Sequence, residues 1–404
     1  MKHRKRKLEM LVFTTFILSS SVVFSQVTWD SLAPLNNAPG IPAVAAANGK
    51  LYVMSGALGT NVPTWEYNPA TNTWAQKQGI PNGCYWSTAV TVNNKIYVMG
   101  GGHPYPGQKY NYIYDPSTDS WTSGADLLTG RMYHSAAAAN GKIYLMGGQN
   151  GDGTSEWYFE EYNPVNDSWS TKAQLPHNGA WYCGAAGIGN YIYRIAGGGS
   201  SNTLIKDWFD VYNTTTNTWV TKEKFHKGLH APAAVTINEE IYLFGGYSNF
   251  TYMDSVWIYN TITETWSNAT FKMREPRSYH RAVIIDSCLY IFSGMNSMAG
   301  LDSSLTRFCN PSIINIEEIN LSKEQLKIYP NPSDGNFTIE MTNNPFDKIE
   351  ISVINSIGQE IYNNNVKPIY SDIHISIGKD IPAGIYIVRL VSKNNIRNQQ
   401  LIIQ

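Results

Sequence analysis

The most prominent feature of the sequence is a motif that recurs at intervals of 47 to 50 residues, counted between tryptophans. Each copy has a short apolar run that ends in glycine, followed later by a tyrosine seven residues before a tryptophan; the clearest copy covers 142–169. The apolar run also occurs at Leu51–Gly56, Ile96–Gly101, Ile192–Gly198, Ile241–Gly246 and Leu289–Gly294. The aromatic pair occurs at Tyr67/Trp74, Tyr114/Trp121, Tyr162/Trp169, Tyr212/Trp219 and Tyr259/Trp266. A period of this length is typical of solenoids and propellers.

The residue types in the repeat predict β-structure. Ile143–Met146 is a short apolar run followed by glycine, as expected for a strand buried between stacked sheets. Asn163 and Pro164 start a turn, because an asparagine side chain can hydrogen-bond to the backbone that follows it and proline fixes φ. Each tryptophan supplies a large apolar surface that can fill the space between neighbouring sheets. Aromatic residues make up 13% of the chain and charged residues 15%, which favours packed β-structure over disorder.

The glycines, the tyrosine and the spaced tryptophan resemble the kelch repeat over about residues 27–312. Kelch repeats form β-propellers with four strands in each blade, so the resemblance implies an all-β fold. The strand tyrosines predict a six-bladed kelch β-propeller over 26–312: Tyr52, Tyr97, Tyr144, Tyr193, Tyr242 and Tyr290. Trp29 matches the end of a repeat, whereas no tryptophan follows Pro311 in the last repeat. The N-terminal strand 27–35 is therefore expected to close the last blade.

Residues 1–25 have the features of a secretory signal peptide. The basic segment Lys2–Lys7 precedes the apolar segments Leu11–Leu18 and Val22–Phe24, and Gln26 follows a suitable cleavage site. A retained membrane anchor is the alternative, but the apolar run is short and interrupted by serines. No later segment is apolar and long enough to cross a bilayer, so the mature chain is expected to lack a transmembrane segment. The net charge of −1 argues against nucleic-acid binding.

The last part of the chain has a different composition. Residues 313–325 carry no repeat signature and are expected to be a linker. Alternating strands over 326–404 predict a small antiparallel β-sandwich. Tyr329–Pro332, Pro382–Tyr386 and the apolar end of the chain resemble the C-terminal sorting domain of the type IX secretion system. The resemblance implies that the type IX secretion machinery is a partner and that the protein is secreted or held at the outer cell surface of a Gram-negative bacterium.

The sequence contains four cysteines, too few for a disulfide framework. Cys84 and Cys183 fall on inner strands of different blades, too far apart to pair. Cys288 opens one strand and Cys309 closes the next strand antiparallel to it, and such neighbours can fall within bridging distance. A disulfide between Cys288 and Cys309 is therefore possible; the alternative is two buried thiols.

Equivalent positions before the strand tyrosines hold a set of aromatic, histidine and arginine residues. In kelch propellers the start of the inner strand lines the axial mouth, so the resemblance implies that these residues surround a ligand there. The predicted ligand-binding residues are Tyr85, Trp86, Arg131, Tyr133, His134, Trp181, Tyr182, His230, Arg277, Tyr279 and His280. The arginines would meet a carboxylate, the histidines would supply polar contacts, and the aromatic rings would stack on a sugar. The alternative is that all of them pack between blades.

The sequence shows no recognisable catalytic site, and we expect no metal and no cofactor. The inner-strand segments 40–47, 84–92, 131–139, 180–188, 229–237 and 277–285 contain no Asp or Glu. Hydrolases and epimerases usually need positioned carboxylates. Candidate carboxylates remain only in loops: Asp152, Glu156, Asp207, Asp254 and Asp302. The histidines have no carboxylate or cysteine beside them that would complete a metal site.

These observations favour a secreted or cell-surface binding module whose axial mouth takes a carbohydrate or a protein partner. The alternative is a carbohydrate-active enzyme, because kelch propellers of similar size include a sialic acid mutarotase. A third interpretation is an adhesion module with no small-molecule site. Fold alone does not decide among them, since propellers host unrelated functions.

Overall fold

The structure is a computed structural model of the whole chain, which divides into two compact units, Met1–Ile314 and Asn315–Gln404. The residues that it describes are 29–36, 40–102, 106–150, 157–177, 181–198, 205–286, 288–296, 300–309, 326–341, 349–355, 360–366, 372–378, 381–392 and 395–404. The predicted signal peptide 1–25 and the linker 313–325 lie outside the described residues. Each unit is considered by itself below.

The described part of the first unit contains six four-stranded antiparallel sheets. The first two are β2 (Ala43–Ala47), β3 (Lys50–Met54), β4 (Gly59–Asn68), β5 (Thr73–Gly83), and β6 (Thr88–Val92), β7 (Lys95–Met99), β8 (Asn111–Asp115), β9 (Ser120–Ser123). The next two are β10 (Ser135–Ala139), β11 (Lys142–Met146), β12 (Phe159–Asn163), β13 (Ser168–Thr171), and β14 (Gly184–Ile188), β15 (Tyr191–Gly198), β16 (Ile205–Asn213), β17 (Thr218–Thr221).

The fifth and sixth sheets differ slightly from the others. The fifth is β18 (Ala233–Ile237), β19 (Glu240–Phe244), β22 (Val256–Asn260) and β23 (Thr265–Asn268), and the sixth is β24 (Arg281–Ile285), β25 (Cys288–Phe292), β28 (Leu305–Cys309) and β1 (Asp30–Ser31). Two short hairpins follow the glycines of these sheets: β20 (Tyr247–Ser248) with β21 (Thr251–Tyr252), and β26 (Met295–Asn296) with β27 (Gly300–Leu301).

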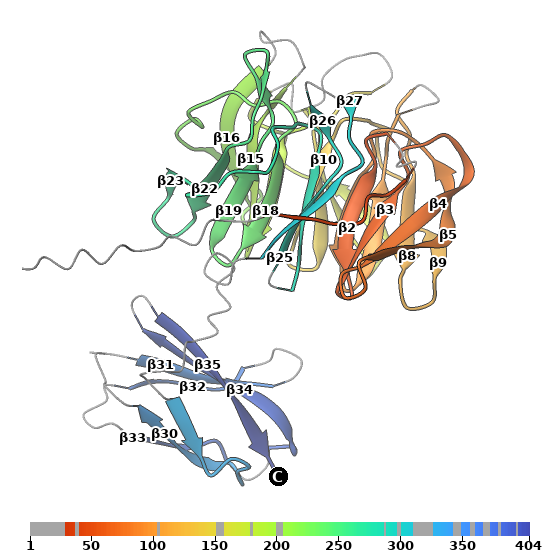
Figure 1. Cartoon of the computed structure of the whole chain (residues 1–404). Helices are drawn as coiled ribbons and strands as arrows, with labels where there is room; N and C mark the ends of the chain where they lie inside the picture. The colour runs from red at the N-terminus through yellow and green to blue at the C-terminus, as the bar shows by residue number, and fades with distance from the viewer. Residues whose placement is uncertain are drawn as a thin grey trace, which may run out of the picture. The chain divides into compact units, whose positions relative to one another are not determined.

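The first strands of the six sheets form a closed ring, and we call them the inner strands. Each contacts the next, in the order β2, β6, β10, β14, β18, β24 and back to β2. Figure 1 shows the same circuit, with the colour running from red β2 around to the cyan strands of the last sheet, which return beside it. The inner strands are rich in Ala, Gly, Val and Thr, and these small side chains allow six strands to approach one axis.

The repeated tyrosine and tryptophan join neighbouring sheets. The Tyr162 hydroxyl donates to the Asp167 carboxylate at 2.6 Å, and that carboxylate also accepts the Ala125 amide of the preceding sheet. The Trp169 indole donates to the Ala125 carbonyl at 2.9 Å. The same indole bond recurs at Trp74, Trp121 and Trp219. Each such bond contributes about 1 kcal/mol, and it joins four of the five tyrosine–tryptophan pairs to the preceding sheet.

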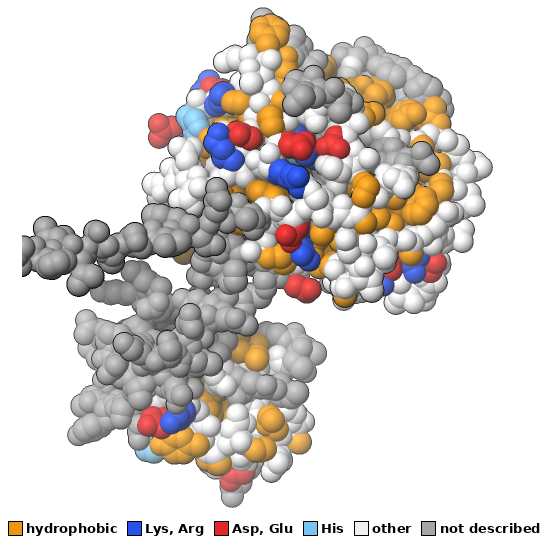
Figure 2. Space-filling model, viewed as in Figure 1, with side chains coloured by type: hydrophobic (Ala, Val, Ile, Leu, Met, Phe, Trp, Pro, Cys, Tyr) orange, Lys and Arg blue, Asp and Glu red, His pale blue; other side chains and the backbone are white. Residues whose placement is uncertain are grey.

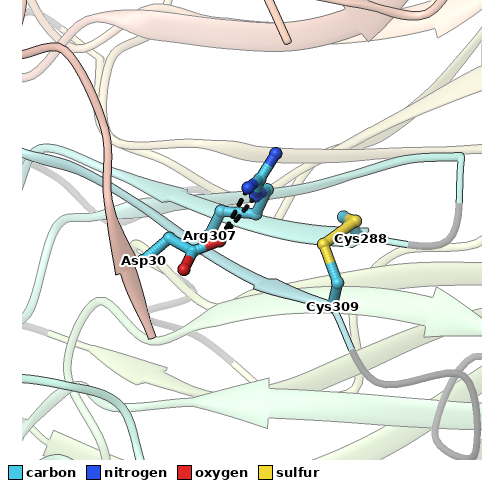
Figure 3. The surroundings of a disulfide bond; sticks show 4 residues. All are labelled: Asp30, Cys288, Arg307 and Cys309. Carbon is cyan, nitrogen blue, oxygen red and sulfur yellow. Dashed lines mark hydrogen bonds and ion pairs between the residues drawn. A yellow bond between two sulfur atoms is a disulfide. The ribbon is translucent and has the colours of Figure 1, made fainter. Parts of the chain in front are cut away.

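The N-terminal segment completes the last sheet. Asp30 is paired in register with Arg307, Ser31 with Thr306, and the Leu32 amide donates to the Leu305 carbonyl at 3.0 Å. Figure 3 shows the ion pair between Asp30 and Arg307, at 2.7 Å. The paired strand is shorter than the expected 27–35, and residues 27 and 28 lie outside the described residues.

Cys288 and Cys309 are directly opposite each other in the β25–β28 register and form a disulfide, with their Cα atoms 4.3 Å apart (Figure 3). Antiparallel neighbours reach this separation, so the backbone places the two sulfur atoms without rearrangement. Cys84 and Cys183 are buried free thiols. Burial raises the pKa of both, which makes them poor nucleophiles at neutral pH.

Charges on the surface of the first unit are largely compensated. Figure 2 shows basic and acidic side chains next to one another on the visible face of this unit. The ion pairs include Lys222–Glu264 at 2.6 Å, Lys224–Asp207 at 3.2 Å and Lys272–Asp254 at 3.2 Å. Exposed pairs of this kind add little stability, at most about 1 kcal/mol each, but they leave no large field of one sign to attract a polyanion.

The described part of the second unit consists of two antiparallel sheets. One holds β29 (Leu326–Tyr329), β30 (Asn336–Met341) and β33 (Asp372–Ser376), and the other holds β32 (Glu360–Val366), β31 (Ile349–Ile354), β34 (Gly384–Ser392) and β35 (Asn395–Ile403). Buried residues of both sheets, such as Ile339, Ile375, Ile351 and Val388, share one core. Among the described residues of the whole chain, no helix is long and apolar enough to cross a membrane.

Candidate functional site

The inner strands surround an axial channel. Its wider section has a volume of about 370 Å³ and is lined by small residues of all six inner strands. A narrower section of about 140 Å³ lies at the beginning of these strands, and the two sections share lining residues such as Ala136 and Ala234. The narrower section is also lined by His134, Tyr182 and His280. The channel therefore opens among the residues that the sequence predicted.

Large aromatic residues stand where the chain turns into the inner strands. Trp86, Tyr133, Tyr182 and Tyr279 have φ values of 63°, 63°, 45° and 58°, in the left-handed region. A non-glycine residue pays about 1–2 kcal/mol for this conformation, and glycine or asparagine is the usual choice. The equivalent residues Ile41 and Ala231 have the same conformation, with φ values of 44° and 51°, so the repeat sets the backbone and four of its six copies carry an aromatic side chain there.

Backbone pairing holds these aromatic residues at the rim of the channel. In these turns, the residue just before the left-handed position forms an isolated antiparallel β-bridge with the residue that follows the glycine pair. Examples are the bridges between Tyr85 and Gly102 and between His230 and Tyr247. The start of the inner strand and the loop after the glycines therefore lie together. This is the arrangement that the kelch resemblance implied for the axial mouth.

The aromatic residues form one connected cluster, which we call the mouth cluster: Tyr85, Trp86, Tyr133, Trp181, Tyr182, His230 and Tyr279. Its ring centroids are 4.9 Å apart for Trp86–Tyr133, 5.1 Å for Tyr133–Tyr182 and 4.8 Å for Tyr182–Tyr279. Tyr85 lies 5.7 Å from Trp86, and Trp181 lies 6.3 Å from Tyr133. The tyrosines and tryptophans are only half-buried, so each keeps accessible surface for a ligand.

Two arginines expected to meet a ligand carboxylate are instead held by carboxylates of the chain. Arg131 is completely buried and pairs with Glu160 of β12 at 2.8 Å. Arg277 is 1% exposed and pairs with Asp302 at 3.2 Å. Both also donate to backbone carbonyls, Arg131 to Gly147 and Arg277 to Ser293. Their guanidinium groups stabilise the sheet interior, which corrects the role expected from their position.

The three histidines of the set are buried and neutral at pH 7. The His134 Nε2–H donates to the Met99 carbonyl at 3.1 Å. His230 donates from Nδ1 to the Gly198 carbonyl, and its Nε2 accepts the Tyr279 hydroxyl at 2.6 Å. His280 is 1% exposed, and among the described residues neither of its ring nitrogens has a hydrogen-bond partner. Among the described residues His134 also leaves its Nδ1 without a partner, so His280, with both nitrogens unpartnered, has the larger unused hydrogen-bonding capacity at the channel.

These histidines should make the stability of the first unit pH-dependent. Burial lowers the pKa of His134 to about 3 and that of His230 to about 4, and burial beside Arg277 and Arg281 lowers that of His280 well below its usual range. The unfolded chain binds these protons near pH 6.5. The free energy of unfolding should therefore fall below pH 6.5, by about 1.4 kcal/mol per pH unit for each histidine, down to its folded-state pKa.

Urea unfolding of the purified protein between pH 7 and pH 4.5 measures this slope. His134→Gln should make the decline shallower, whereas His374→Gln, at an exposed position of the second unit, should leave it unchanged. An identical slope for the wild type and His134→Gln would contradict a buried neutral imidazole at this position.

Arg281 is a channel residue that the sequence analysis missed. It begins β24 and lines the narrow section of the channel, together with His134, Tyr182 and His280. The inner-strand segments contain no Asp or Glu, but one of the strands begins with this basic residue. A single charged side chain in an otherwise small and apolar strand set was the available signal.

Each candidate loop carboxylate that the structure describes is held by a basic side chain. Asp207 pairs with Lys224, Asp254 with Lys272, and Asp302 with Arg277. Asp152 and Glu156 lie outside the described residues. Within the ranges that the structure describes, no three His, Cys, Asp or Glu side chains are placed to hold a metal ion. The arrangement at the mouth supports stacking and hydrogen bonding.

Family models match both the repeats and the tail. A model described as Kelch motif matches residues 87–128 and 130–176, and one described as KLHDC2/KLHL20/DRC7 Kelch-repeats domain matches 182–325. A model described as Secretion system C-terminal sorting domain matches 327–404. These matches confirm the kelch repeats and the type IX secretion sorting domain that the sequence predicted.

A curated relative and a solved structure are similar to parts of the chain. Kelch-like protein 33 of Homo sapiens is 33% identical over 81 residues, which are 19% of this chain and 15% of that protein. The chain therefore spans less than a sixth of that relative. The solved structure "Structure of YjhT" aligns with 68% of this chain and 95% of its own, with a TM-score of 0.58 and 16% identity. At this identity the likeness supports the all-β propeller fold alone.

Proposed function

Because the chain is a kelch-repeat protein that ends in a type IX secretion sorting domain, we propose that it is an exported carbohydrate-binding module. In this proposal the six sheets are the six blades of a propeller over 26–312, and 326–404 is a small β-sandwich that directs export. The signal peptide 1–25 would direct the first step of export. The protein would then work outside the cell, secreted or attached to the outer surface of a Gram-negative bacterium.

The mouth cluster is the observation that carries the proposal. It presents half-buried aromatic faces around the opening of the axial channel, and four of its members occupy equivalent positions in the repeat. Aromatic faces stack on the apolar C–H faces of sugar rings, and the phenol and indole groups keep a polar tip for hydroxyl groups. Such contacts give affinities from micromolar to millimolar, or about −8 to −4 kcal/mol.

A glycan array probed with the mature protein tests the proposal, with a Tyr133→Asn variant as the decisive comparison. Tyr133 contacts Trp86, Trp181 and Tyr182, so its loss removes the centre of the cluster. Asparagine tolerates the left-handed backbone, so the melting temperature should change little. Binding to the glycans recognised by the wild type should fall at least about tenfold.

Tyr191→Asn is the matched control. Tyr191 is 43% exposed and begins β15, at the opposite end of an inner-strand hairpin from the mouth cluster. This variant should bind the same glycans as the wild type. If the Tyr133→Asn protein bound the glycans normally but had a lower melting temperature, the cluster would serve packing and not binding. Capture of a protein partner without any glycan would favour the interaction-module alternative.

A carbohydrate-active enzyme, such as a sialic acid mutarotase or epimerase, is the second candidate function. The unpartnered ring nitrogens of His280 favour it, because a neutral imidazole at the channel can accept or donate a proton. Against it, the described lining of the channel contains no carboxylate. Mutarotation of a bound sugar, followed by NMR with and without His280→Gln, distinguishes turnover from binding alone.

A further inference from the structure

We infer that the mouth recognises an acidic sugar and that Arg281, at the floor of the mouth, holds its carboxylate. This inference rests on the proposed function, because it concerns the ligand of the same site. It replaces the arginines expected from the sequence with a residue that faces the channel.

The position of Arg281 is the first argument. Each of the six inner strands has five residues, and among all of these described residues Arg281 is the only charged one. The equivalent first positions of the other inner strands are Ala43, Thr88, Ser135, Gly184 and Ala233. A repeat that uses small residues at this level in five copies has a long cationic side chain in the sixth. Packing around the axis does not require that change.

The second argument is the missing counter-charge. Arg131, Arg194 and Arg277 are buried, and each pairs with a carboxylate: Glu160, Asp210 and Asp302. For Arg281 the described residues provide no carboxylate within ion-pairing distance. Its Nη1 makes only long hydrogen bonds, 3.3 Å each, to the carbonyls of Tyr279 and His280. A guanidinium group stays charged in proteins, and holding it half-buried without an ionic partner is unfavourable. A bound carboxylate would supply the missing charge through the fork of the guanidinium.

The surroundings of Arg281 are suited to an anion. His280, which is 1% exposed and has no hydrogen-bond partner among the described residues, lines the same 140 Å³ section, and so does Tyr182. Both can donate a hydrogen bond to an oxygen atom. No Asp or Glu lines the described channel, so nothing there repels a carboxylate.

The size of the site indicates how the ligand is oriented. A volume of 140 Å³ is several times the roughly 10–15 Å³ of accessible space that one water molecule needs. The section is large enough for a carboxylate and its attached carbon atoms but too small for a whole oligosaccharide. The sugar ring would therefore remain at the mouth cluster, stacked on Tyr182 or Tyr279, while its acidic group enters the channel.

Calorimetric titration of the mature protein with sugar acids and their neutral methyl esters tests the inference. The probes are glucuronate, galacturonate and N-acetylneuraminate, each beside its ester. At least one acid should bind about tenfold or more tightly than its ester, the difference that one charge-assisted contact supplies. Arg281→Gln should abolish this preference, and Arg281→Lys, which keeps the charge without the fork, should restore part of it. Lys327→Gln removes the same charge from an exposed site of the second unit and should change nothing.

Melting temperatures separate a binding role from a packing role. Loss of a half-buried charge that has no ionic partner should leave the melting temperature of Arg281→Gln equal to or above that of the wild type. An earlier melt with an unchanged acid preference would make Arg281 a structural residue and overturn the inference. Equal binding of acids and esters, lost in Tyr133→Asn, would overturn the inference while leaving the carbohydrate-binding proposal intact. Failure of every acid and ester, together with a blank glycan array, would overturn both.

Discussion

Deletion of residues 26–36 is expected to lower the melting temperature of the first unit by about 10 °C or more. The deletion removes the outer strand of the last sheet and its buried side chains. Leu35 is 2% exposed, and the Trp29 ring lies 5.3 Å from Phe308 while its indole donates to the Lys272 carbonyl at 2.8 Å. Loss of one buried leucine costs about 2–5 kcal/mol, and each kcal/mol corresponds to about 2–4 °C in a protein of this size.

The same deletion also weakens the first sheet. The Ala33 carbonyl accepts the Trp74 indole at 2.8 Å, and the Ala33 amide donates to the Asn72 side chain at 2.9 Å. The last sheet and the first sheet therefore both lose contacts, and β28 becomes an unpaired sheet edge. Differential scanning calorimetry measures the effect. Asp30→Asn, which removes only the exposed ion pair with Arg307, is the matched control and should shift the melt by about 2 °C or less. A deletion protein that melts like the wild type would refute closure by the N-terminal segment.

Removal of the C-terminal unit should abolish export while leaving the first unit folded. A chain that ends at Pro311 lacks the whole segment 327–404 that matches the sorting domain. The two units have separate cores, so the truncated chain should keep the melting temperature and the disulfide of the first unit. In a host with a type IX secretion system, the amount of protein at the surface and in the medium should fall to background.

Immunoblots of the cell surface, the medium and the cell interior measure this distribution. The full chain with Lys327→Gln, a change at one exposed residue of the second unit, should be exported normally. Normal surface delivery of the chain that ends at Pro311 would contradict the role of the C-terminal unit. Loss of the truncated chain from every fraction, with a lowered melting temperature of the purified protein, would instead show that the first unit depends on the second for folding.

The repeat made much of the fold accessible from the sequence, because each copy repeats the contacts as well as the residues. Tyr162 and Trp169 could be recognised as sheet-joining residues since equivalent pairs occur in four other copies. The sequence placed Cys288 and Cys309 on neighbouring antiparallel strands and left a disulfide or two thiols open; the register of the structure brings them directly opposite each other. The aromatic members of the mouth cluster could be grouped for the same reason, because equivalent positions in a ring of repeats face the same axis.

The roles of the charged residues were less accessible. Arg131 and Arg277 follow the same repeat frame as the aromatic residues, but their direction depends on partners such as Glu160 and Asp302, which come from later segments of the chain. The position of a residue in the repeat predicts where its side chain lies, but it does not predict which carboxylate the side chain will pair with. Arg281 differs from these residues because it departs from the repeat. Its role becomes apparent only by comparison with the buried arginines, which are all paired with carboxylates of the chain.

The disulfide has a mechanical consequence whenever force acts on the C-terminal tail of the chain. Cys309 is the last residue of β28, the strand from which the chain continues toward the second unit. Tension on the tail would enter the first unit at this residue and would peel β28 away from β25, starting at the Cys309 end. The bond to Cys288 carries that load directly into β25. Rupture under force must then begin elsewhere in the unit, and the short β1–β28 pairing that closes the ring is protected from the pull.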